Sequence, residues 1–245
     1  MTSDSWRSLR LIFFGFAALS SCASPQQGHG TLYASSTLDA SRPLNSSRTL
    51  ELARERGLVD VRKVIPGITI DLRYATADNI TGHSIYPPHM PCLLRTETAE
   101  KLKRAQAILQ AQGYGLRIWD AYRPPEAQET LHKAGGSTGM FLSPNAGWSR
   151  HCGGIAVDLT LVDAQGNQQR MPTGFDQDFA HAGINYRGSD PVVAQNLRIL
   201  QAAMKQAGFI QLESEWWHFD DAEYLNNPQP IVYGWRIALP GMSPP

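Results

Sequence analysis

Residues 149–158 read Ser-Arg-His-Cys-Gly-Gly-Ile-Ala-Val-Asp, and this stretch decides how the chain is interpreted. His151 and Asp158 lie seven residues apart, an odd spacing that would put them on opposite faces of one regular strand. Gly153 and Gly154 interrupt that regularity. We therefore expect His151 on a loop or bent strand and Asp158 near the start of a buried strand, with the glycines turning the chain so that both side chains reach one point.

A second short stretch, residues 215–218, reads Glu-Trp-Trp-His. Glu215 and His218 are three residues apart, so they would share a face of a helical turn, although the aromatic neighbours suit a strand as well. In either conformation both polar side chains can approach the same point. The two tryptophans are expected to wall that site and exclude water, which would strengthen the electrostatic interactions inside it.

Together the two stretches offer the donor set of a catalytic zinc site. Zinc accepts histidine nitrogen and aspartate oxygen, and a catalytic site uses three protein ligands and keeps one position for water. We predict one Zn²⁺ per chain, bound by His151, Asp158 and His218, with Glu215 left free as general base. A single histidine or aspartate of this kind is usually a surface or core residue; their co-occurrence in two compact patterns favours a functional site.

The pattern Ser-x-His-x-x-Gly-x-Ala-x-Asp, followed by Glu-x-x-His, resembles the zinc D,D-peptidase family, which includes the vancomycin-resistance D-alanyl-D-alanine dipeptidases and D,D-carboxypeptidases. The resemblance extends from about residue 59 to the C-terminal region. Three further stretches are similar to the dipeptidase branch: residues 71–76 with Asn79, residues 120–124 and residues 174–176. The resemblance implies a hedgehog/D,D-peptidase-like fold and zinc-dependent hydrolysis of the D-alanyl-D-alanine dipeptide.

The same resemblance implies a role for Arg123, which would bind the carbonyl oxygen of the scissile bond. Negative charge develops on that oxygen during hydrolysis, and a fixed guanidinium stabilises it. Pro124 and Pro125 restrict the backbone that follows Arg123. A structural salt bridge to Asp120 is the alternative interpretation.

Recognition of a free dipeptide requires partners for its ammonium and its carboxylate. The resemblance implies Asp176 for the ammonium and polar contacts near the termini from Ser149 and Tyr74. Ser149 could instead cap its own loop, and Tyr74 could be a core residue.

Cys152 departs from the polar or basic residue that often follows the first histidine in the family, and Arg150 departs from the usual small residue before it. Three interpretations of Cys152 remain open: a fourth ligand, a disulfide partner of Cys92, or a small buried apolar residue. A fourth protein ligand would fill the position that water needs, so catalysis disfavours it.

The composition is that of one soluble globular domain. The chain has 245 residues, formal net charge zero, 42% hydrophobic and 18% charged residues. Balanced charge and the lack of a basic cluster give no reason to expect nucleic acid as a partner. Thus the expected partners are a small dipeptide substrate and a membrane, the latter only through a lipid anchor.

The first 22 residues are expected to form a signal peptide, because Arg7 and Arg10 precede a short apolar run at residues 11–19. Residues 19–22 read Leu-Ser-Ser-Cys, which resembles a bacterial lipobox with Cys22 as the lipidated residue. An ordinary signal cleaved nearby is the alternative. We expect the protein to be exported to the periplasm and anchored by lipid to the outer membrane.

A flexible linker is expected at residues 23–48, which are rich in small and polar residues, and the peptidase domain at residues 49–245. Helical and strand patterns come in blocks within that domain, which favours an α+β fold with a small antiparallel sheet flanked by helices. Helices are predicted at residues 50–57, 96–112 (capped by Thr96), 125–134 and 190–208, and strands at 68–74, 116–119, 155–162 and 209–212, the last leading into a strand at Glu215.

Two alternative functions remain open from the sequence. A D,D-carboxypeptidase or peptidoglycan endopeptidase of the same fold would differ in the loops around the cleft. A non-catalytic zinc-binding module belongs to another class, but such a module has no use for a free carboxylate at Glu215.

Overall fold

The computed structural model describes residues 46–142 and 147–244, which all belong to one compact unit. The predicted signal peptide, Cys22 and residues 23–45 of the predicted linker lie outside the described residues. Within the described part of the chain, no helix combines the length and the apolar character needed to cross a bilayer.

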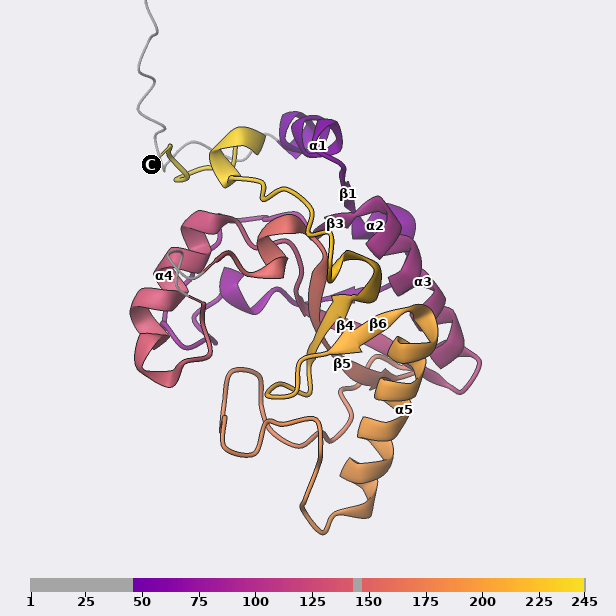
Figure 1. Cartoon of the computed structure of the whole chain (residues 1–245). Coiled ribbons are helices and arrows are strands. Elements are labelled where there is room, and N and C mark those ends of the chain that lie inside the picture. The colour runs from indigo at the N-terminus through magenta and orange to yellow at the C-terminus, as the bar shows by residue number, and fades with distance from the viewer. Residues whose placement is uncertain (1–45, 143–146, 245) are drawn as a thin grey trace, which may run out of the picture. The chain divides into compact units, whose positions relative to one another are not determined.

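A five-stranded sheet forms the centre of the domain, in the order β2-β4-β5-β7-β6 (Figure 1). The β2–β4 pair is parallel and the other three pairs are antiparallel. A second, two-stranded antiparallel sheet pairs β1 with β3. The strands are β1 (Leu58–Asp60), β2 (Thr69–Ile70), β3 (Leu93–Arg95), β4 (Tyr114–Asp120), β5 (Ala156–Asp163), β6 (Phe209–Gln211) and β7 (His218–Asp221).

Two long helices, α3 and α5, pack against each other and against the sheet (Figure 1). Asp190 caps α5 by accepting hydrogen bonds from the backbone N–H groups of Val192 and Val193, and Gly208 ends it with φ +100°. The helices are α1 (Ser46–Glu55), α2 (Val61–Val64), α3 (Thr96–Gln110), α4 (Pro125–Gly135) and α5 (Pro191–Ala207). Short 3₁₀ turns are η1 (Arg73–Ala75), η2 (Gly136–Thr138), η4 (Arg150–Gly153), η5 (Ala222–Tyr224) and η6 (Gly234–Ile237).

The α+β prediction is confirmed, and so are the predicted helices at α3, α4 and α5 and the strands at β4, β5 and β6. Helix α1 begins at Ser46, so the last residues of the predicted linker are helical. The sheet is not wholly antiparallel, because β2 pairs in parallel with β4. A short edge strand carries no sequence signal for the direction of its pairing.

Three local predictions are wrong. The strand predicted at residues 68–74 ends at Ile70, and the chain turns at η1, where the backbone N–H groups of Ala75 and Thr76 donate to the carbonyls of Leu72 and Arg73. Thr96 is the first residue of α3 and not its cap, since the preceding residue still belongs to β3. Glu215 lies in a turn before β7 and not in a strand.

The tryptophans at positions 216 and 217 belong to the core and do not line the pocket described below. Trp216 makes edge-to-face contacts with Trp119 and Trp217, at ring centroid distances of 5.6 and 5.5 Å. Such pairs contribute about 0.5–1.5 kcal/mol beyond their burial. The expectation that they wall the site is therefore wrong; they support β7 from inside the protein.

Candidate metal centre

Strand register brings two of the predicted ligands together. Asp158 of β5 pairs directly with His218 of β7 on one side and with Asp120 of β4 on the other. Directly paired residues on neighbouring strands point to the same face of the sheet. The sheet itself therefore places the Asp158 carboxylate beside the His218 imidazole.

His151 reaches the same point from the 3₁₀ turn η4. Ser149 begins this turn and its Oγ accepts a hydrogen bond from the backbone N–H of His151 at 3.4 Å. Gly154 ends it with φ +71°, and a Cβ at that position would lie 2.5 Å from a Leu58 methyl group. The prediction that glycines turn the chain between His151 and β5 is confirmed, and at residue 154 only glycine fits.

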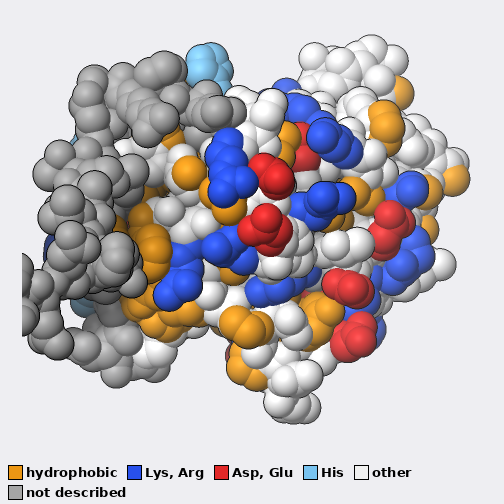
Figure 2. Space-filling model, turned by 90° about the horizontal axis from the view of Figure 1, so that it is seen from above, with side chains coloured by type: hydrophobic (Ala, Val, Ile, Leu, Met, Phe, Trp, Pro, Cys, Tyr) orange, Lys and Arg blue, Asp and Glu red, His pale blue; other side chains and the backbone are white. Residues whose placement is uncertain are grey.

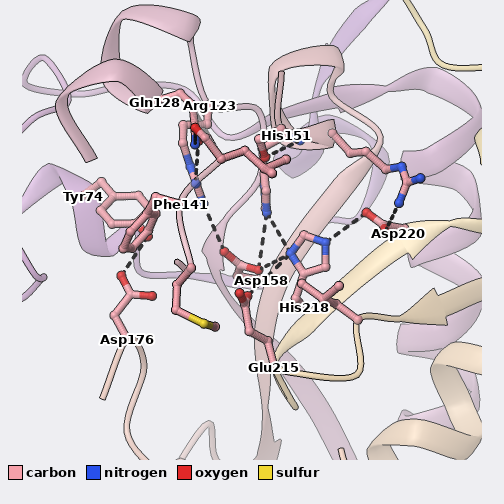
Figure 3. A pocket seen from close by; sticks show the side chains of 15 residues that line it. Tyr74, Arg123, Gln128, Phe141, His151, Asp158, Asp176, Glu215, His218 and Asp220 are labelled. Atoms are coloured by element: carbon pink, nitrogen blue, oxygen red, sulfur yellow. Dashed lines mark hydrogen bonds and ion pairs between the residues drawn. The ribbon is translucent and has the colours of Figure 1, made fainter. Parts of the chain in front are cut away.

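Three atoms converge at this point: His151 Nε2, Asp158 Oδ1 and His218 Nδ1 (Figure 3). The two nitrogens lie 3.1 Å apart, His218 Nδ1 is 3.0 Å from Asp158 Oδ1, and His151 Nε2 is 3.4 Å from it. Tetrahedral bonds of 2.0–2.1 Å to zinc would separate ligand atoms by about 3.3–3.4 Å. The spacing therefore fits one zinc-sized ion.

The outer nitrogen of each imidazole has its own acceptor. His151 Nδ1 lies 2.6 Å from the Ala121 carbonyl oxygen, and His218 Nε2 lies 2.9 Å from Asp220 Oδ1. Because a carbonyl or carboxylate oxygen accepts hydrogen bonds, each outer nitrogen carries the hydrogen and the inner one presents a lone pair. Two lone pairs and a carboxylate thus face one another, an arrangement that requires a cation.

The pKa values of His218 and Asp158 also indicate that the cluster favours a positive charge. A proton on His218 Nδ1 can supply this charge instead of a metal ion: burial lowers the pKa of His218, but in the protonated ring hydrogen bonds to Asp158 and Asp220 outweigh it and raise the pKa well above its usual value. Burial raises the pKa of Asp158, but the two histidines hold it far below its ordinary range. Among the described residues, His151, Asp158 and His218 are the group whose ligand atoms all lie within 4.8 Å of one another.

Glu215 stands beside the cluster without joining it. Its Oε2 lies 3.9 Å from His218 Nδ1, and its side chain lines the same pocket. Burial is the main reason that the pKa of Glu215 is raised, and the Asp158 charge adds to the effect. A carboxylate with a raised pKa next to a metal position is suited to take a proton from water.

Arg123 forms the salt bridge to Asp120 that was one interpretation from the sequence, and it also lines the pocket. Its Nε donates to Asp120 Oδ2 at 2.8 Å, Nη1 to Gln128 Oε1 at 2.9 Å, and Nη2 lies 3.4 Å from Asp158 Oδ2. The guanidinium also stacks on the Tyr74 ring, with Cζ 4.9 Å from the ring centre. The salt bridge to Asp120 therefore exists, and it fixes Arg123 at the wall of the pocket.

The remaining predicted residues also line this pocket. Asp176 lies on the loop between β5 and α5, and its Oδ2 accepts a hydrogen bond from the Tyr74 hydroxyl at 2.8 Å (Figure 3). Burial chiefly raises the pKa of Asp176 to about 7; the Tyr74 hydrogen bond opposes that rise. Ser149 lines the pocket and caps η4 at the same time.

The pocket has a volume of about 130 Å³, well below the roughly 300–1,000 Å³ of sites for drug-sized ligands. Leu142 and Leu212 stand at its lining with 50% and 40% exposure, respectively. Its full lining is Tyr74, Arg123, Gln128, Met140, Phe141, Leu142, Ser149, Arg150, His151, Asp158, Asp176, Leu212, Glu215, His218 and Asp220. A pocket of this volume therefore suits a substrate much smaller than a drug-sized ligand.

Two residues at the site were missed from the sequence. Asp220 lies two residues after His218, and alternate residues of a strand share a face, so this spacing could have identified it. Gln128 faces Arg123 from α4, and only the tertiary structure reveals the contact.

Cys152 and Cys92 are both buried free thiols, so no disulfide joins them. Burial raises the pKa of Cys152 to about 12, which disfavours the thiolate that metals bind. Of the three interpretations of Cys152, the small buried apolar residue is confirmed.

Residues 54–233 match the model of the D-ala-D-ala dipeptidase family, and the chain belongs to this family. A D-alanyl-D-alanine dipeptidase of Escherichia coli (strain K12) is 39% identical over 171 residues, covering 70% of this chain and 88% of the relative. One of Enterococcus faecium is 32% identical over 197 residues, covering 71% and 96%.

Among solved structures, a mutant of the vancomycin resistance D,D-pentapeptidase VanY in complex with Zn(II) matches with a TM-score of 0.34 and 16% identity. The match covers 55% of this chain and 75% of that chain.

Proposed function

We propose that this protein is a zinc-dependent dipeptidase that hydrolyses free D-alanyl-D-alanine. The observation that carries the proposal is the convergence of three acceptor atoms, from His151, Asp158 and His218, beside the free carboxylate of Glu215. A purely structural zinc site would be closed by a fourth protein ligand, whereas this cluster borders an open pocket.

The donor set suits one Zn²⁺ per chain. Two imidazole nitrogens and one carboxylate oxygen are ligands that zinc prefers, and each histidine is oriented by a hydrogen bond from its outer nitrogen. When bound, zinc supplies a Lewis acid that lowers the pKa of water and polarises the substrate carbonyl.

Glu215 moves the proton. Its carboxylate accepts a proton from the attacking water as the oxygen forms its bond to the peptide carbonyl carbon. The C–N bond then breaks, and Glu215 returns the proton to the leaving nitrogen, so that two molecules of D-alanine result. Burial keeps the pKa of Glu215 above its ordinary value, which makes both transfers easier near neutral pH.

Arg123 stabilises the negative charge that develops on the carbonyl oxygen. A guanidinium has five N–H groups, and three of them are directed to Asp120, Gln128 and Asp158. One hydrogen on each terminal nitrogen remains to donate to the substrate oxygen. Because its partners hold the side chain in place, little reorganisation accompanies the reaction.

Asp176 receives the ammonium group of the dipeptide. Burial is the main cause of the raised pKa of this carboxyl, and among the described residues no cation forms an ion pair with it. A substrate ammonium would supply that positive charge. Tyr74 orients the carboxylate through its hydroxyl group, and Ser149 offers a polar contact at the other wall. A longer peptide would bring a neutral amide to Asp176, which favours the free dipeptide.

The test is hydrolysis by purified protein with and without chelator. We expect D-Ala-D-Ala to be cleaved, L-Ala-L-Ala and a pentapeptide stem to be cleaved at least about tenfold more slowly, and activity to return when zinc is restored. Faster cleavage of the pentapeptide would instead identify a carboxypeptidase. Zinc binding without cleavage of any peptide would identify a non-catalytic module.

We further propose that the protein is exported and anchored through lipid on Cys22 to the periplasmic face of the outer membrane. Residues 19–22 lie at the end of a short apolar run and resemble a lipobox, which supports this proposal. Wild-type protein should partition with membranes, and Cys22→Ser should release it. A wild-type protein that is wholly soluble after export would contradict the anchor.

A further inference from the structure

A dipeptide bound across the metal cluster would place opposite charges at the two ends of the pocket. Figure 3 shows Asp176 on one side of the metal cluster and Asp220 on the other, with His151, Asp158 and His218 between them. A dipeptide whose scissile amide lies at the cluster therefore has its ammonium toward Asp176. Its carboxylate must then lie toward the Asp220 end, and it needs a cation there.

Two arginines line the pocket, and they differ in what their nitrogens already bind. Each nitrogen of Arg123 has a carboxylate or amide oxygen as partner, and the side chain is 6% exposed. Arg150 is 40% exposed, and its Nη1 donates to Asp220 Oδ2 at 2.6 Å. Within the described residues, no hydrogen bond engages Nε or Nη2 of Arg150, so these donors are available.

Asp220 holds Arg150 in place. This buried carboxylate uses Oδ1 for His218 Nε2 and Oδ2 for Arg150 Nη1, so both of its oxygens are engaged. A guanidinium can bind one carboxylate with one edge and a second with another, because its five N–H groups lie in one plane. Arg150 is thus oriented beside a metal ligand and still able to accept an anion.

We propose that Arg150 binds the C-terminal carboxylate of the substrate through its Nε and Nη2 hydrogens. The proposal rests on the dipeptidase function and adds the residue that binds the negatively charged end of the dipeptide. Asp176 and Arg150 then select together for an α-amino acid pair with both termini free. The peptide carbonyl lies between them, within reach of Arg123.

The test compares D-Ala-D-Ala with its C-terminal amide, in the zinc-loaded full-length protein. Wild type should prefer the acid, and Arg150→Gln should lower kcat/KM on the acid about 10- to 100-fold, mainly through KM, with little change on the amide. Arg150→Lys should recover part of the loss. Arg170→Gln is the matched control, because Arg170 is an exposed arginine that also pairs with an aspartate, Asp190, at 2.7 Å.

The possible results distinguish a carboxylate contact of Arg150 from a structural role. Equal losses on acid and amide, or loss of zinc in Arg150→Gln, would make Arg150 a support for Asp220 and His218 and overturn the carboxylate contact. Unchanged kinetics on both substrates would also overturn it. A wild-type enzyme that cleaves acid and amide equally well would refute this subsite while leaving the dipeptidase function intact, whereas one that cleaves neither would refute the function itself.

Discussion

The metal-binding half of the pocket and the half that we propose receives the substrate termini are built from different kinds of structure. Asp158 and His218 stand on neighbouring strands, where the register of β5 against β7 sets their separation. Asp176 stands on the loop between β5 and α5 in a left-handed conformation, φ +53°, and meets Tyr74 of η1. The sheet thus places two of the three metal ligands, whereas His151 and Asp176 stand on segments around it.

The difference has an energetic meaning. A carboxylate and an imidazole on paired strands keep their geometry as long as the sheet persists, so the ligand set is preorganised. A loop residue depends on one or two contacts, and Asp176 depends on a hydrogen bond across 102 residues of sequence. Substitutions in the first half should therefore abolish activity, and those in the second half should weaken binding.

The largest effect is expected for His151→Ala. This change removes one of three ligands, so zinc should be lost and activity should fall to background. Elemental analysis and hydrolysis of D-Ala-D-Ala measure the two quantities, and circular dichroism checks the fold. Full zinc content together with wild-type activity would break the assignment of the metal-binding half.

The second-largest effect is expected for Glu215→Gln. The amide keeps nearly the same volume but cannot accept the proton, so activity should fall about 10²- to 10⁴-fold while zinc and folding persist. The same elemental and kinetic measurements apply. Loss of zinc along with activity would make Glu215 a ligand; retention of both would transfer the base function to another carboxylate, with Glu213 the nearest in sequence to test.

Asp176→Asn should have a smaller effect that depends on pH. Only the ionised carboxylate attracts the substrate ammonium, so in wild type KM should fall as pH rises through about 7. It should rise again when the substrate amine, with a pKa of about 7.7–8.0, loses its proton.

The pKa of Asp176 reflects Asp158, Arg123 and Glu215 as well as burial and Tyr74, so the asparagine variant is the control that isolates its contribution. Asp176→Asn should lower kcat/KM about 10- to 100-fold near pH 7.5. Its KM should lack the step near pH 7. A step that persists in this variant would assign it to another group and remove Asp176 from ammonium binding.

The smallest effect is expected for Tyr74→Phe. The phenylalanine ring still packs under Arg123, but the hydrogen bond that favours ionised Asp176 is lost. The pKa of Asp176 should rise further, so the fall in KM should move to higher pH, with a loss of about three- to tenfold in kcat/KM at neutral pH. A pH profile that matches wild type would show that Tyr74 does not act through Asp176.

The sequence predicted most of the metal-binding half because its signals are local. The glycines after His151 and the buried run at Asp158 identify a turn followed by a strand, and both features are present. The strand predicted at residues 68–74 was wrong near Tyr74, because an alternation of apolar residues is the same whether a strand continues or the chain turns, as it does at η1. The side-chain network of Arg123 joins separate elements, and its detail depends on packing that no short pattern records.

The register of β5 has a consequence for how the protein is assembled. Asp158 must meet a residue 60 positions later in the chain before the first pair of ligands exists. A nascent chain that lacks β7 offers only His151 and Asp158, so tight metal uptake has to wait until the last strands have docked. Zinc release is therefore a direct readout of the separation of β5 from β7, and a zinc-sensitive dye would follow the unfolding of this sheet in real time.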